Sequence, residues 1–204
     1  AISSLTGGDV ASGIVTGGLI GSQVIQPLAG AISESAQYTA SLDKAKIALR
    51  GITKDQESFE IALRAANRAT EEFNVPQEVA IKGMQRLSAA VIGAGGNVNN
   101  AEEAFLNTVA AIKATGGTAD DVKSALTAMV QIFSKGKVSA EELSGQLGER
   151  FPGAVTAFAE ANNMTTQSLQ ESLKNGTVGL DMLSKFIASL GEEYIPIAKE
   201  IAKS

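Results

Sequence analysis

The chain has 204 residues, a formal net charge of -5 at pH 7, and no cysteine, histidine or tryptophan. Without cysteine it has neither disulfides nor thiolate metal ligands, and without histidine it lacks the commonest general base and metal ligand. This composition disfavours most enzymes and predicts no catalytic residue, no cofactor and no metal site. A pI near 4.9 also argues against sequence-independent DNA binding, which needs clustered lysine and arginine.

Residues 1–32 form a glycine-rich apolar segment that differs from the rest of the chain. No charged residue lies between positions 10 and 33, and Gly13, Gly17 and Gly21 are spaced four apart. Such spacing lets helices approach one another closely. The stretch is long enough to span a membrane, but serine, threonine, glutamine and proline interrupt it. The three glycines are therefore candidate contacts for helix packing or for a membrane.

Apolar residues at helical spacing predict three helices in the next part of the chain, over residues 42–50, 56–73 and 76–92. In the second of these, Phe59, Leu63 and Ala66 are predicted to face the core, and Arg64 and Arg68 to face solvent.

A glycine-rich loop at residues 93–97 precedes a helix, as a phosphate-binding loop does. No lysine closes it and no strand is predicted before it, as a nucleotide loop would require. We therefore interpret this loop as a mobile connector.

Three predicted helix starts share one pattern, in which a capping residue is followed by alanine and two acids. The capping residues are Asn100, Thr118 and Ser139. Acidic side chains are favourable at a helix N-terminus, where backbone amides lack partners. We interpret these carboxylates as helix caps, because a catalytic pair must converge across a cleft and calcium needs six or more oxygens.

Apolar stripes at helical spacing follow these starts, and glycines at 116, 117, 136, 148, 176 and 191 interrupt them. The predicted stripes are Phe105, Val109 and Ile112; Val122, Leu126, Met129 and Phe133; Val155, Phe158 and Ala159; and Leu180, Leu183, Phe186, Ile187 and Leu190. The predicted fold class is all-α: an array or bundle of short amphipathic helices, with the glycine-rich apolar segment at its N-terminus.

The most informative stretch is a helical corner at residues 137–153. Ser139 and Glu142 are predicted to form a capping box, in which each side chain binds the other residue's amide. Gly148 is predicted to end the helix in the left-handed conformation, with Pro152 in the first turn of the next helix and Phe151 stapling the two together. The whole structural motif is Ser139, Glu142, Leu143, Leu147, Gly148, Glu149, Phe151, Pro152 and Gly153.

Three pieces of this corner, residues 138–143 (VSAEEL), 146–149 (QLGE) and 152–154 (PGA), resemble the conserved domain of tail tape measure proteins from long-tailed bacteriophages and prophages. The resemblance continues through the helices on either side, over residues 76–87, 101–105, 132–137, 163–169 and 173–176. It covers about residues 42–190 and is strongest from about 130 to 180.

The resemblance implies a structural phage tail protein that sets tail tube length during assembly and is released during DNA ejection. It implies a virion component inside the tail tube, present in the bacterial cytoplasm during assembly. The implied partners are further copies of itself as a trimer or hexamer, the tail tube protein, tail tip or baseplate proteins and tail assembly chaperones, with no specific nucleic-acid binding. Residues 33–204 are then a helical tape measure domain within a longer polypeptide.

Three other interpretations stay open. Residues 1–32 can act as a membrane-interacting or channel-forming delivery segment that enters the host envelope. Glu34 and Ser35 are similar to the glutamate-serine pair of peptidoglycan lytic transglycosylases, although the rest of that motif is absent, and the polar start of a helix explains Glu34 better. An acidic helical chain with an apolar head also suits an export or toxin-delivery helper.

Overall fold

The computed structural model describes the backbone of residues 22–204 and the side chains of residues 35–204. It divides the chain into two compact units, Ala1–Ala40 and Ser41–Ser204. The predicted contacts of Gly13, Gly17 and Gly21 lie outside the described residues, as does the side chain of Glu34. Among the described helices, none combines the length and apolar character needed to cross a membrane.

The described part of the chain is helical, which confirms the predicted all-α class. The elements are α1 (Ser22–Thr53), α2 (Gln56–Phe73), α3 (Gln77–Gly93), α4 (Val98–Ala114), α5 (Ala119–Lys135), a π-helix η1 (Glu141–Leu147), α6 (Ala154–Ala161), α7 (Thr166–Asn175) and α8 (Leu180–Ile201). The predicted helix at 42–50 is thus the end of a longer one. The reason is that no glycine or proline interrupts residues 31–50.

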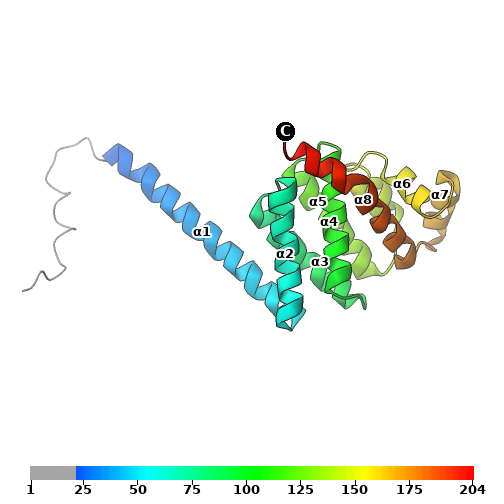
Figure 1. Cartoon of the computed structure of the whole chain (residues 1–204), viewed down its shortest axis with the longest axis horizontal. Coiled ribbons are helices and arrows are strands. Elements are labelled where there is room, and N and C mark those ends of the chain that lie inside the picture. Colours follow the sequence, from blue (N-terminus) through cyan, green and yellow to red (C-terminus); the bar gives the residue numbers. More distant parts are fainter. Residues whose placement is uncertain (1–21) are drawn as a thin grey trace, which may run out of the picture. The chain divides into compact units, whose positions relative to one another are not determined.

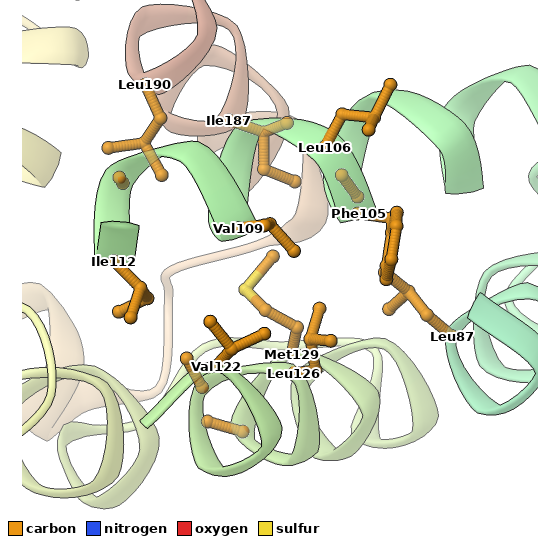
Figure 2. Close-up of a cluster of buried hydrophobic side chains, with 14 of the residues drawn as sticks. Leu87, Phe105, Leu106, Val109, Ile112, Val122, Leu126, Met129, Ile187 and Leu190 are labelled. Carbon is orange, nitrogen blue, oxygen red and sulfur yellow. The ribbon is translucent and has the colours of Figure 1, made fainter. Parts of the chain in front are cut away.

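Helix α4 is the centre of the larger unit (Figure 1). Of its 17 residues, 11 are buried. Figure 2 shows Phe105, Val109 and Ile112 of α4 between Met129 of α5 and Ile187 of α8. The second half of α4 is buried on nearly every side, as in a helix at the centre of a core, so the surrounding helices are held together through α4.

The predicted stripes on α4, α5 and α8 are confirmed, apart from Leu180, which is half-buried. In the α6 stripe, Phe158 and Ala159 are buried and Val155 is half-buried. Burying large apolar side chains contributes roughly 1.5–3 kcal/mol each, so each of these stripes stabilises the unit.

The predicted core face of α2 is wrong in part. Phe59 and Leu63 are only half-buried. The buried face consists of Ala62, Ala65, Ala66, Ala69 and Phe73. Alanines let neighbouring helices approach α2 closely, so the small residues take the inner face. Phe59 instead lies under the guanidinium of Arg50, 4.8 Å from the ring centroid to Cζ.

Helices α4 and α8 approach each other closely at Gly191. A Cβ atom added to Gly191 would lie 2.4 Å from Nδ2 of Asn107. That amide is buried and donates a hydrogen bond of 2.9 Å to the carbonyl of Ile187. Gly191 therefore makes room for a polar side chain that fixes the position of α8 along α4.

Of the three predicted helix starts, the one at Thr118 is capped as predicted. The one at Asn100 is capped by a different residue. Thr118 and Asp121 form a capping box at the start of α5, as the sequence predicts for Thr118. Helix α4 begins three residues earlier than predicted, because Asn97 is its cap and Asn100 returns the hydrogen bond. The end of the glycine-rich loop is thus fixed to α4 by its own side chain.

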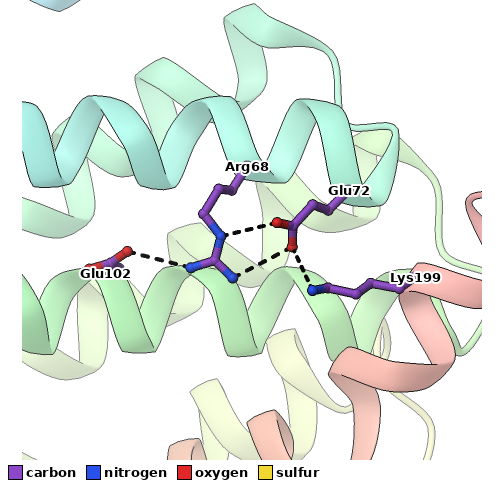
Figure 3. A network of polar contacts seen from close by, with 4 residues as sticks. All are labelled: Arg68, Glu72, Glu102 and Lys199. Atoms are coloured by element: carbon purple, nitrogen blue, oxygen red, sulfur yellow. Dashed lines mark hydrogen bonds and ion pairs between the residues drawn. The ribbon is translucent and has the colours of Figure 1, made fainter.

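An ion-pair network joins α2, α4 and α8 at the surface (Figure 3). Arg68 pairs with Glu72 at 3.3 Å and with Glu102 at 3.6 Å, and Lys199 pairs with Glu72 at 3.1 Å. Arg68 was predicted to face solvent, but it is half-buried between two carboxylates. Burial raises the pKa of Glu72, and the hydrogen bonds and charges of Arg68 and Lys199 outweigh this and lower it.

Candidate functional site

The corner at residues 137–153 begins where α5 ends. Lys135 is the last residue of α5, and Gly136 turns the chain with a φ of 70°. Val138 then donates a backbone hydrogen bond of 2.9 Å to the carbonyl of Val178, beside an isolated β-bridge between Lys137 and Gly179. This short pairing anchors the corner to the segment that precedes α8.

The predicted short α-helix in the corner is a π-helix, η1. Its last turn closes with a hydrogen bond of 3.0 Å from the Gly148 amide to the Leu143 carbonyl, five residues earlier. Leu143 and Leu147 are buried, and Glu149 is exposed. π-Helices are rare and usually occur as single turns, which is why apolar spacing alone predicts an α-helix here.

The predicted capping box between Ser139 and Glu142 is wrong. The residue before η1 is Ala140, and it makes no side-chain cap. The Ser139 hydroxyl instead donates to the Glu142 carboxylate, which also accepts from Nζ of Lys135. The Glu142 side chain thus pairs with the last residue of α5 and is fully buried.

The electrostatics of Glu142 reflect two opposing effects. Burial raises the pKa of its carboxyl, and the hydrogen bonds from Lys135 and Ser139, with the charge of Lys135, outweigh burial and lower it. The hydrogen bond to Glu142 likewise raises the pKa of Lys135. The carboxylate is thus held in its charged form as an internal link between α5 and η1.

The predicted left-handed conformation of Gly148 is wrong, and Gly153 adopts it instead. Gly148 is right-handed, with φ -62° and ψ -32°, and does not end η1 in the left-handed region. It is required for space, because a Cβ atom there would lie 2.4 Å from the Ser144 carbonyl oxygen. The left-handed glycine is Gly153, with a φ of 93°, directly before α6.

Pro152 and Phe151 lie in the turn between η1 and α6. Helix α6 begins at Ala154, so Pro152 precedes the first turn in which it was predicted. Phe151 is buried, but its ring contacts Tyr194 of α8 edge-on, with ring centroids 5.3 Å apart. Burial, together with the nearby Glu193, raises the pKa of Tyr194 to about 12. The aromatic pair fastens the corner to α8.

Replacing Gly148 with alanine is expected to lower the free energy of unfolding by about 2 kcal/mol, as overpacking does where backbone cannot move. Urea unfolding followed by circular dichroism measures this loss. Gly145 is the matched control, since nothing lies within 4 Å of a Cβ atom added there. Alanine at Gly145 should be neutral or stabilising, and an equal loss in both variants would contradict the steric role of Gly148.

The corner at residues 137–153 connects α5, η1 and α8 through side-chain contacts, and we call it the joint. It brings together the carboxylate of Glu142, the ammonium of Lys135 and the hydroxyl of Ser139, and each interacts with another of the three. Within the described residues, no cluster of three or more potential metal-ligating His, Cys, Asp or Glu side chains occurs. Lys135 and Tyr194 belong to the joint but were missed, because both lie outside the motif and are joined to it only by folding.

Comparisons with known proteins agree with this picture of a structural element. Residues 33–204 match the family model described as tape measure protein. A probable tape measure protein of Salmonella phage Felix O1 is 39% identical over 92 residues, which are 45% of this chain and 12% of that protein. The tape measure protein of Lactococcus phage F4-1 is 25% identical over 174 residues, covering 81% of this chain and 46% of that protein.

A further relative is the probable tape measure protein of Lactococcus phage p2, which is 25% identical over 185 residues, or 84% of this chain and 18% of that protein. The chain thus spans less than half the length of each of these relatives. No solved structure matches it. Since the family model covers most of its length, including the helical corner, the chain belongs to the tape measure protein family.

Proposed function

We propose that this chain is a structural segment of a phage tail protein that sets the length of the tail tube during assembly and is released during DNA ejection. The observation that carries the proposal is the family match over residues 33–204, on a unit whose described polar clusters link helices to one another. A helix rises 1.5 Å per residue, so a mostly helical chain held at one end can limit tube growth in proportion to its residue count.

The segment is not one continuous helix. Its helices from α2 to α8 are interrupted by turns and pack around α4. The apolar faces that hold them together are those that a fully extended chain would expose. We therefore propose that residues 33–204 act as a folded module within the longer chain, or rearrange when that chain threads the tube, while residues 1–32 form a separate packing segment.

The proposed partners follow from this placement. They are further copies of the chain in a trimer or hexamer, the tail tube protein, tail tip or baseplate proteins, and tail assembly chaperones. The proposed location is the inside of the tail tube in the virion, after assembly in the bacterial cytoplasm. The scattered charges and the net charge of -5 support a surface that does not retain DNA passing along the tube.

Mass spectrometry of purified virions, before and after triggered DNA ejection, tests the release step. Peptides from residues 41–204 are expected in intact virions and should be depleted from emptied tails. The tail tube protein is the internal control, because it stays in the tube. Full retention of these peptides after ejection would contradict release, and their absence from intact virions would contradict a tail role.

A further inference from the structure

A hollow in the surface lies between α3 and α5. Its volume is about 270 Å³, and its apolar floor is formed by Val79, Gly83, Leu126 and Val130. Gly83 shapes this floor, because a Cβ atom there would lie 2.6 Å from Cδ1 of Leu126. The two helices therefore approach closely and leave a shallow apolar groove.

The rim of the groove is charged. It carries Glu78, Lys82, Arg86, Asp120 and Lys123. Lys82 is paired with Glu78. The Lys82 hydrogen bond is the largest influence lowering the pKa of Glu78, and the charge of Lys123 on the facing helix contributes. Arg86 and Lys123 are exposed, so the groove has two cations available for carboxylates of an incoming segment.

A second apolar surface, with acidic instead of basic neighbours, lies at the end of α8. Ile197 and Ile201 are 43% and 42% exposed, although both are large and apolar. Glu193 and Glu200 are exposed on the same helical face, since residues three, four and seven apart share a face. The last turns of α8 thus present two exposed isoleucines that alternate with two carboxylates.

The α8 end of a chain does not reach the groove of the same chain. It is anchored to α2 by the ion pair of Lys199 with Glu72 and by the hydrogen bond from Asn74 to the Ala202 carbonyl, 3.0 Å long. Figure 2 shows α4 between α5, which carries Leu126, and α8. Only the α8 of another molecule can therefore enter the groove.

We propose that the end of α8 of one copy docks into the α3–α5 groove of a second copy, with its isoleucines on the apolar floor and its carboxylates facing Arg86 and Lys123. This rests on the self-association in the proposed function and names the two surfaces that make it. Because the surfaces differ, repetition closes a ring when the rotation between copies permits, and otherwise extends as a chain. The contact is small, so the fraction of associated molecules depends on protein concentration, and its ion pairs make the affinity depend on salt.

Sedimentation equilibrium of the chain 1–204, at 10 to about 500 μM in low and high salt, tests the docking. A groove variant carries Arg86→Glu with Lys123→Glu, and a helix variant carries Glu193→Lys with Glu200→Lys. Each is expected to lower the association constant at least tenfold. An equimolar mixture of the two should recover it, because each variant then meets a complementary surface. The matched control for the groove variant, Arg64→Glu with Lys185→Glu, makes the same change in net charge at exposed positions outside both surfaces.

Thermal unfolding of each variant is measured first, and glutamine versions at the same positions replace any variant that melts lower. A monomeric wild-type chain at the highest concentration overturns the proposal. A loss no larger than that of the control, a loss in only one reversed variant, or no recovery in the mixture also overturns it. None of these outcomes affects the release of the protein at ejection, so failure of the docking is distinguishable from failure of the proposed function.

Discussion

Replacing Lys135 with methionine is expected to lower the midpoint of thermal unfolding by roughly 10 °C at pH 7, because it leaves the Glu142 carboxylate buried without its cation. Glu142 is fully buried. Among the described residues, its carboxylate accepts side-chain hydrogen bonds from Lys135 and Ser139. An uncompensated buried charge destabilises far more than the loss of a surface ion pair.

The pH dependence separates this mechanism from a loss of packing. In the wild type the pKa of Glu142 is lowered, so its stabilising contribution is present above the ordinary carboxyl value of 4.5 and is lost as pH falls through the lowered value. In the variant, burial without Lys135 raises the pKa, so protonation relieves the buried charge. The difference between the two proteins should therefore shrink between pH 7 and pH 4.

The matched control is Lys185→Met, at an exposed lysine for which the structure gives no ion pair within the described residues. Its melting midpoint should stay close to that of the wild type at both pH values. A Lys135→Met variant whose deficit is the same at pH 4 and pH 7 would contradict a role of Lys135 through its charge.

Replacing Gly191 with alanine is expected to lower the free energy of unfolding by about 3 kcal/mol, from overpacking and from a broken buried hydrogen bond. The added Cβ atom would fall 2.4–2.7 Å from three side-chain atoms of Asn107. Asn107 must then turn away and give up its hydrogen bond to the Ile187 carbonyl. Urea unfolding measures the loss.

Two further variants test the cause. Gly51→Ala is the control, since Gly51 lies within α1 and nothing is within 4 Å of an added Cβ atom. It should gain up to about 1 kcal/mol from helix propensity. The double variant Asn107→Ala with Gly191→Ala should lose less stability than the two single variants added together, because the smaller residue at 107 makes room for the new Cβ atom. Strict additivity would contradict the close contact.

Much of the fold could be predicted from the sequence because the deciding forces were local. Capping at Thr118 depends on residues three apart, and the stripe of Phe105, Val109 and Ile112 depends on helical period. The inner face of α2 could not be predicted, because Phe59 and Ala62 compete for the same core. The alanines occupy the buried face of α2 only when neighbouring helices approach closely, and that depends on how the whole unit packs.

The candidate site was predicted less well than the fold, for related reasons. The motif residues lie at a corner as predicted, but Glu142 pairs with Lys135 and the Ser139 hydroxyl instead of capping a helix. Lys135 is seven residues before Glu142, on a different helix, so no spacing rule joins them. Tyr194 is farther still along the chain. Motif spacing therefore located the joint, while tertiary packing decided which atoms meet within it.

Tail length as a function of the number of copies of residues 33–204 tests the central claim most directly. The phage gene is altered in frame to carry zero, one or two copies, and tails are measured by electron microscopy. We expect shorter tails with none and longer tails with two, in equal steps no greater than about 260 Å, the rise of a fully extended helix of this size. Tails of one length in all three phages would contradict a length-setting role for this segment.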